Sequence, residues 1–143
     1  INMATINASI SVSSDIMSYP VSINKSMTMT KAASCHGLEE TSGLNTRKFN
    51  SVDPVVIISN TEGTASKASK VYIRNTGSDK AQNFYVSLNA AASAATTTES
   101  IGKLYGGDWM LIPWIATAAT SHDFCVVPST AETMTLEWMV FEE

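Results

Sequence analysis

The most reactive side chains of the sequence fall into two pairs. Cys35 and His36 are adjacent, and His122 precedes Cys125 by three residues; these are both histidines and both cysteines of the chain. Two thiolates and two imidazoles can hold Zn²⁺ tetrahedrally, and a thiolate beside an imidazole can act as a nucleophile. However, adjacent residues on a strand point to opposite faces, so Cys35 and His36 would converge only within a loop.

We therefore interpret each pair as a buried thiol and a surface imidazole, and we predict no catalytic residue, no metal and no cofactor. A small hydrolase or metal-dependent enzyme built on these four side chains stays open as an alternative, as does a disulfide between Cys35 and Cys125. The sequence has no Gly-x-Ser-x-Gly elbow, phosphate loop or dinucleotide fingerprint. The carboxylate pair Glu39-Glu40 is expected in a solvated loop, and Glu142-Glu143 is expected to end the chain in solvent.

The composition limits the classes of partner. The 143 residues carry a net charge of -4, with 44% hydrophobic and only 15% charged residues, and serine, threonine and alanine together make up about a third of the chain. A net acidic chain argues against a nucleic-acid-binding module, which needs basic groups to neutralise phosphates. No signal peptide is visible at the N-terminus, and the longest apolar run, 109–119, is broken by Pro113 and too short to span a bilayer. We expect a soluble protein with no membrane partner.

Apolar and polar residues alternate along much of the sequence, and this alternation predicts the strands that must position the reactive side chains. Between Ala4 and Val12, apolar residues occupy the even positions and polar residues the odd ones, as in a half-buried strand. Similar strands are expected at 21–29, 55–58, 70–74, 84–88, 101–105, 109–114, 124–127 and 133–141. This pattern predicts an all-β fold, an antiparallel β-sandwich or jelly roll of about eight short strands.

Several details follow from the same pattern. The strands at 70–74 and 84–88 are expected to form a hairpin, and 55–58 to be buried on both sides or central in a sheet. The stretch 32–50 is expected to be mainly loop, and 90–100 a long exposed connection. We predict a single β-sandwich domain over 1–143, in which 1–50 supplies either first strands or a partly extended N-terminal arm that orders on a partner.

Large aromatic residues provide candidates for an interface. Trp138 alternates with the core face of the last strand, so we assign it to the core. Trp109, Met110, Pro113 and Trp114 lie in a strand that Pro113 excludes from the centre of a sheet. We predict that these four residues form an oligomer contact near a sheet edge. A sugar-binding groove lined by tryptophan is the alternative.

The C-terminal half resembles small structural proteins of tailed-bacteriophage virions. The resemblance rests on the strand Lys70-Val71-Tyr72-Ile73-Arg74-Asn75-Thr76-Gly77, the segment Gly106-Gly107-Asp108-Trp109-Met110-Leu111-Ile112-Pro113-Trp114 and the closing strand Thr135-Leu136-Glu137-Trp138-Met139-Val140-Phe141. It covers about half of the chain and supplies no catalytic residues.

The resemblance implies a non-enzymatic virion protein. We expect a capsid decoration or cement protein that bridges capsid subunits, located on the capsid surface after a soluble stage in the host cytoplasm. Its expected partners are the major capsid protein or other virion proteins, and further copies of itself, with a trimer favoured. A neck or tail component, or a receptor- or carbohydrate-binding module of the virion, is the alternative function.

Overall fold

A computed structural model gives the structure of the chain. It describes residues 6–15, 21–29, 40–64, 67, 69–88, 100–116 and 122–142. The chain divides into two compact units, residues 1–40 with residue 143, and residues 41–142. Each unit is described by itself.

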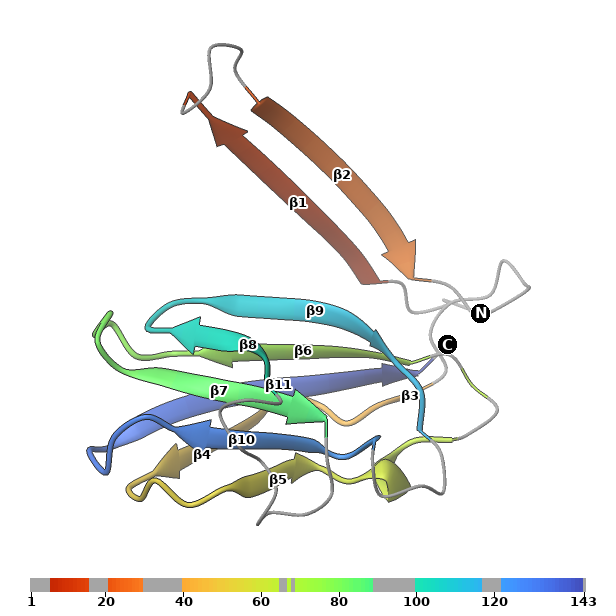
Figure 1. The fold of residues 1–143 in the computed structure, drawn as a ribbon. Helices are drawn as coiled ribbons and strands as arrows, with labels where there is room; N and C mark the ends of the chain where they lie inside the picture. The colour runs from red at the N-terminus through yellow and green to blue at the C-terminus, as the bar shows by residue number, and fades with distance from the viewer. Residues whose placement is uncertain are drawn as a thin grey trace. The chain divides into compact units, whose positions relative to one another are not determined.

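The described part of the first unit is an antiparallel pair of strands, β1 (Ile6–Ser14) and β2 (Val21–Met29), which we call the β1–β2 hairpin (Figure 1). The strands pair from Ile6 opposite Met29 to Ser14 opposite Val21, without any shift of register. The prediction of strands in these two segments is confirmed.

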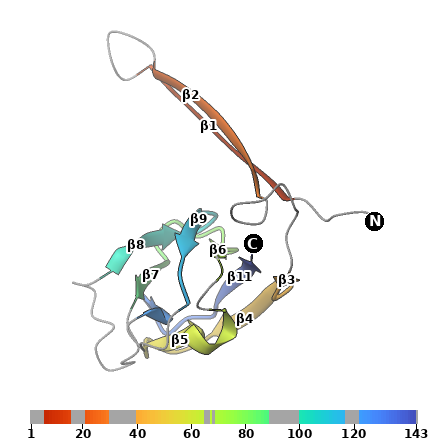
Figure 2. The ribbon, with the colours of Figure 1, turned by 90° about the vertical axis from the view of Figure 1, so that its right-hand side faces the viewer.

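The second unit contains two antiparallel sheets. One consists of β5 (Val55–Ile58), β10 (Phe124–Pro128), β7 (Asn83–Leu88) and β8 (Ser100–Tyr105), in this order. The other consists of β3 (Glu40–Thr41), β4 (Asn45–Phe49), β11 (Met134–Glu142), β6 (Ser69–Asn75) and β9 (Trp109–Trp114), with β3 and β4 both against β11. A short 3₁₀ helix, η1 (Asn60–Glu62), lies between β5 and β6. Figure 2 shows the two sheets as two layers.

The core lies between the two layers. Phe49 of one sheet meets Phe84 of the other edge to face, with ring centroids 5.2 Å apart. Trp114 and Phe124 make a second contact between the sheets, with centroids 6.0 Å apart. Residues of both sheets fill the rest of the core, among them Ile57, Ile58, Val71, Ile73, Val86, Leu104, Val126, Met134, Leu136 and Val140. The predicted all-β fold of packed antiparallel sheets is confirmed.

The predicted hairpin between 70–74 and 84–88 is wrong. β6 pairs with β9 and β11, whereas β7 pairs with β8 and β10. The chain between β6 and β7 instead crosses from one sheet to the other. The buried Asn75 holds this crossing, because its side-chain amide donates to the Leu104 carbonyl at 3.1 Å and its amide oxygen accepts from the Gly77 N–H at 3.0 Å. A turn signal marks where a chain reverses but does not specify the sheet that it enters next.

Two other expectations need correction. The stretch 32–50 contains both β3 and β4, which pair with β11, and Phe49 of β4 enters the core. Residues 32–39 lie outside the described part of the chain. β5 is an edge strand rather than a central one. Of the expected connection at 90–100, residues 90–99 lie outside the described part of the chain and Ser100 begins β8.

Candidate functional site

The β1–β2 hairpin has one apolar and one polar face. On the apolar face, Ala8 lies opposite Met27 and Val12 opposite Ile23. On the polar face the opposed pairs are Asn7 with Thr28, Ser9 with Ser26, Ser11 with Asn24 and Ser13 with Ser22. Because side chains alternate along a strand, these two sets of pairs lie on opposite faces of the hairpin.

The apolar face of the hairpin is exposed. Ile10 is 48% exposed, Val12 43%, and Ile23 and Met27 each 46%. A contiguous row of large apolar side chains at this exposure is typical of an interaction surface rather than of an ordinary monomer surface. Lys25, which lies opposite Ile10, is the one charged residue on this face. The hairpin is therefore the strongest candidate for a functional site among the described residues.

The four residues predicted as an interface all lie on β9, an edge strand of its sheet. Trp109 is 51% exposed and Pro113 is also exposed, so these two residues are accessible. Met110 is partly buried and packs against the core. Trp114 is buried, and its indole N–H donates to the His122 carbonyl at 2.8 Å. On β9, Trp109 and Pro113 are therefore accessible, whereas Met110 and Trp114 face the core.

The outer face of the same sheet carries a row of aromatic and charged side chains. Trp109 lies directly opposite Arg74 on the neighbouring strand. The Arg74 guanidinium lies 3.4 Å from the Glu137 carboxylate, which also accepts a hydrogen bond from the Tyr72 hydroxyl at 2.9 Å. Burial and this bond to Glu137 raise the pKa of Tyr72. This face therefore presents the exposed ring of Trp109 beside the polar groups of Tyr72, Arg74 and Glu137, which hold one another in place.

The cysteine and histidine pairs are only partly described. Cys35 and His36 lie outside the described residues. Cys125 is a free, buried thiol whose pKa is raised by burial and by the neighbouring charge of Asp123. The part of the chain that the structure describes brings together no group of three potential metal ligands.

A buried carboxylate at the end of β11 was missed from the sequence. Glu142, expected in solvent, is only 4% exposed. It accepts a hydrogen bond from the Thr64 N–H at 2.6 Å and lies 3.7 Å from the Lys67 ammonium. The alternation of the strand contains the signal, because Glu142 has the same parity as Leu136 and Val140 on the core face. Residue 143 lies outside the described part.

A second buried carboxylate holds the other end of the same loop. Asp123, at 8% exposure, accepts a hydrogen bond from the Asn60 N–H at 2.6 Å. The two carboxylates thus fix the loop between β5 and β6 by accepting hydrogen bonds from its backbone at Asn60 and Thr64. Between these points, Gly63 packs so closely that a Cβ atom there would lie 2.7 Å from the Ala116 Cβ. We assign this cluster a structural role.

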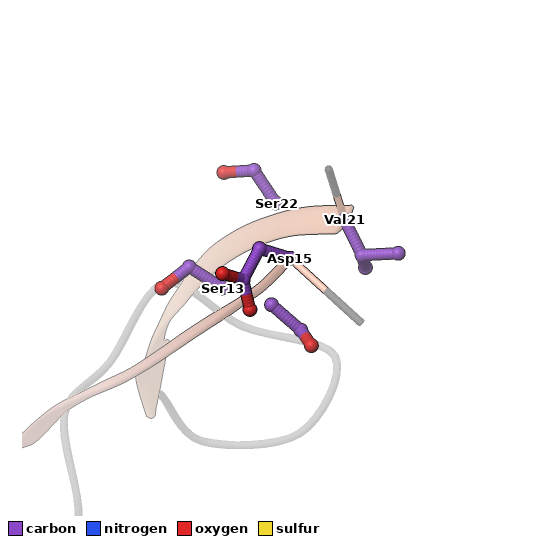
Figure 3. A pocket seen from close by; sticks show the side chains of 5 residues that line it. Ser13, Asp15, Val21 and Ser22 are labelled. Atoms are coloured by element: carbon purple, nitrogen blue, oxygen red, sulfur yellow. The ribbon is translucent and has the colours of Figure 1, made fainter. Parts of the chain in front are cut away.

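One hollow lies at the end of the β1–β2 hairpin (Figure 3), with a volume of about 350 Å³. It is lined by Ser13, Ser14, Asp15, Val21 and Ser22 and is open to solvent. Its lining contains a single carboxylate and no cationic or imidazole group, so nothing in it indicates a particular ligand.

Comparison with known proteins finds no family model that matches this chain and no curated protein that matches it. Within the described residues there is no helix with the length and apolar character needed to cross a membrane. The chain is therefore classed by its structure alone, as a β-sandwich joined to an amphipathic β-hairpin.

Proposed function

We propose that this chain is a non-enzymatic structural protein of a bacteriophage virion, a decoration or cement protein that bridges capsid subunits. The observation that carries the proposal is the exposed apolar face of the β1–β2 hairpin, in which Val12, Ile23 and Met27 are all accessible. A protein that binds a shell by many weak contacts needs such surfaces and needs no reactive centre. That this larger assembly is a virion is inferred from the sequence resemblance.

The proposal assigns the major capsid protein as the main partner of this face. The apolar side chains would be buried against capsid subunits, and each buried methylene contributes about 0.8 kcal/mol. Because one particle carries many copies, modest affinity per copy gives a stable coat.

Cosedimentation with purified phage capsids tests the proposal. The full chain is expected to pellet with capsids that lack it, and the double variant Val12→Ser, Ile23→Ser is expected to lose most of this binding. The matched control, Ser11→Ala with Asn24→Ala, changes the polar face of the same strands and is expected to bind as well as the parent. A parent protein that never pellets with capsids, or that is absent from purified virions, would contradict the proposal.

The exposed indole of Trp109 favours a second candidate, a glycan-binding module of a virion tail. Sugar rings stack on exposed aromatic faces while charged side chains bind their hydroxyls, and Arg74 lies directly beside Trp109. Screening on a glycan array tests this candidate. Binding that is lost in Trp109→Ala but kept in Ile115→Ala would support it, since both side chains are 51% exposed. Absence of binding to every glycan would exclude it.

A further inference from the structure

The outer edge of β1 lacks the features that prevent edge strands from pairing. β1 spans nine residues, Ile6–Ser14, and contains no charged residue, proline or glycine. Its pairing with β2 is continuous, so no bulge twists the edge away. Natural proteins avoid such long, flat, uncharged edges because they pair with other strands.

The sheets of the second unit differ from the hairpin in this respect, because each of their edges is interrupted. The interruptions are the short β5 with its shift of register, the shift of register along β8, Pro113 in β9 and the break at Gly43 between β3 and β4. β1 is thus the exception among the described edges, which points to an edge that is used for pairing.

We propose that β1 pairs with β1 of a second copy of this chain, antiparallel about a two-fold axis at Ile10. Ile10 is the middle residue of β1, so Ile6 would lie opposite Ser14 of the partner and Ala8 opposite Val12 of the partner. All these residues have even numbers, and pairing even with even keeps every apolar side chain on one face. The result is a four-stranded sheet in the order β2-β1-β1-β2 with a continuous apolar face.

Charge selects β1 rather than β2 for this contact. Lys25 is the middle residue of β2, so the equivalent symmetric pairing of β2 would place two ammonium groups directly opposite each other. Like charges opposite each other destabilise a sheet. A lysine in the middle of a strand is also one of the devices that protect an edge strand, which fits β2 as the outer edge of the four-stranded sheet.

Stability of the hairpin provides an independent reason for the pairing. A two-stranded hairpin is only marginally stable in water, whereas three or more strands with an apolar face can be stable. The contact with a second copy raises the number of strands from two to four. It also doubles the apolar face available to a larger partner.

This inference goes beyond the proposed function and does not depend on it, because it concerns contacts between two copies in solution. Its two-fold symmetry differs from the trimer that the sequence resemblance implies. Light scattering coupled to size-exclusion chromatography of the full chain tests it. We expect a mass of two chains of 15.3 kDa each for the parent.

Two matched variants locate the contact. Ile10→Lys places two ammonium groups opposite each other at the axis and should weaken dimerisation at least tenfold. Ile23→Lys makes the same change on β2, where the side chain is equally accessible at 46% against 48%, and should leave the dimer intact. Mixing Ile10→Lys with Ile10→Glu should restore a dimer, because opposite charges then meet.

The possible outcomes separate the alternatives. A monomeric parent, or a trimer that Ile10→Lys does not affect, overturns the inference. Equal disruption by Ile10→Lys and Ile23→Lys also overturns it and indicates that the apolar faces stack instead. Tryptophan fluorescence checks folding of the second unit in each variant, because Trp109, Trp114 and Trp138 all lie there. Far-UV circular dichroism, compared with the parent, checks that the strands of the hairpin are kept. Failure to bind capsids, which tests the proposed function, would leave the mass measurements unchanged.

Discussion

Glu142 shows how a single side chain can fix a loop at the end of a β-sandwich. Its carboxylate lies at 4% exposure, next to the Thr64 N–H and the Lys67 ammonium. A buried charge is tolerated only when hydrogen bonds and an opposite charge compensate its lost hydration. The loop between β5 and β6 therefore compensates the buried charge of Glu142, and the Glu142 carboxylate in turn holds the loop in place.

Replacing Glu142 by Gln should destabilise the second unit by about 1.5–3 kcal/mol, the range for a hydrogen bond to a charged group. The substitution removes the charge that faces Lys67 and keeps the size of the side chain. Urea unfolding followed by tryptophan fluorescence measures the change. Asp53→Asn, at an exposed position, is the control and should stay within about 0.5 kcal/mol of the parent. An effect no larger than that of the control would contradict the structural role of Glu142.

The turn between β8 and β9 makes a comparable prediction from packing. A Cβ atom at Gly106 would lie 2.5 Å from the Asp79 carbonyl oxygen, a backbone atom that cannot rotate away. Gly106→Ala should therefore cost about 1–3 kcal/mol through overpacking. At Gly102, in β8, nothing lies within 4 Å of the equivalent position. Gly102→Ala should leave the unfolding midpoint nearly unchanged in the same urea titration, and equal losses in both variants would refute the packing argument.

Burial of Cys125 predicts a dependence on pH. Its pKa is raised above the ordinary value of a thiol, first by burial and then by Asp123. Unfolding lets the thiol lose its proton at a lower pH, so its contribution to stability is complete below the unfolded pKa, about 8.5, and is lost as pH rises above it. The free energy of unfolding should decrease between pH 8 and pH 10. The decrease should be smaller in Cys125→Ala, and an identical decrease in both proteins would assign it to other groups.

At the scale of elements, alternation along the chain predicts strands well and their partners poorly. The even positions of β1 and β11 mark one face of each strand directly, and both strands were predicted from them. The pairing of β6 with β9 and β11 joins segments far apart in the sequence, and no local pattern specifies it. The apolar faces of β1 and β2 follow from the same alternation, but their pairing as a hairpin was not predicted, and the burial of Asp123 depends on which loop folds over it.

Lys25 gives an element-scale prediction from the proposed pairing of β1. Lys25→Ile removes the charge from the middle of β2 and leaves both edges of the hairpin unprotected. Copies could then pair through β1 and β2 in turn, so we expect growth from dimers to larger assemblies, measured by analytical ultracentrifugation. Lys25→Arg keeps the charge and should remain dimeric. A Lys25→Ile protein with the parent's mass would show that this lysine does not limit pairing.

At the scale of the molecule, the two units differ in how they obtain stability. Every residue of the hydrophobic core cluster belongs to residues 41–142, from Phe49 in β4 to Val140 in β11. The second unit therefore has the enclosed core of an independent domain. The hairpin has an apolar face but no opposing layer among the residues of its own unit that the structure describes, which suits it to contacts with other chains.

A fragment of residues 40–143, which keeps β3 and leaves Glu142 within the chain, should consequently fold without the hairpin. We expect its free energy of unfolding in urea to lie within about 1 kcal/mol of the value for the full chain, because the core is unchanged. The chain's three tryptophans are all retained, so the same fluorescence signal reports both transitions. The fragment should also be monomeric in light scattering, since it lacks β1. A fragment that unfolds several kcal/mol more easily would show that residues 1–39 belong to the fold of the sandwich, and a dimeric fragment would move the self-association surface to the sandwich itself.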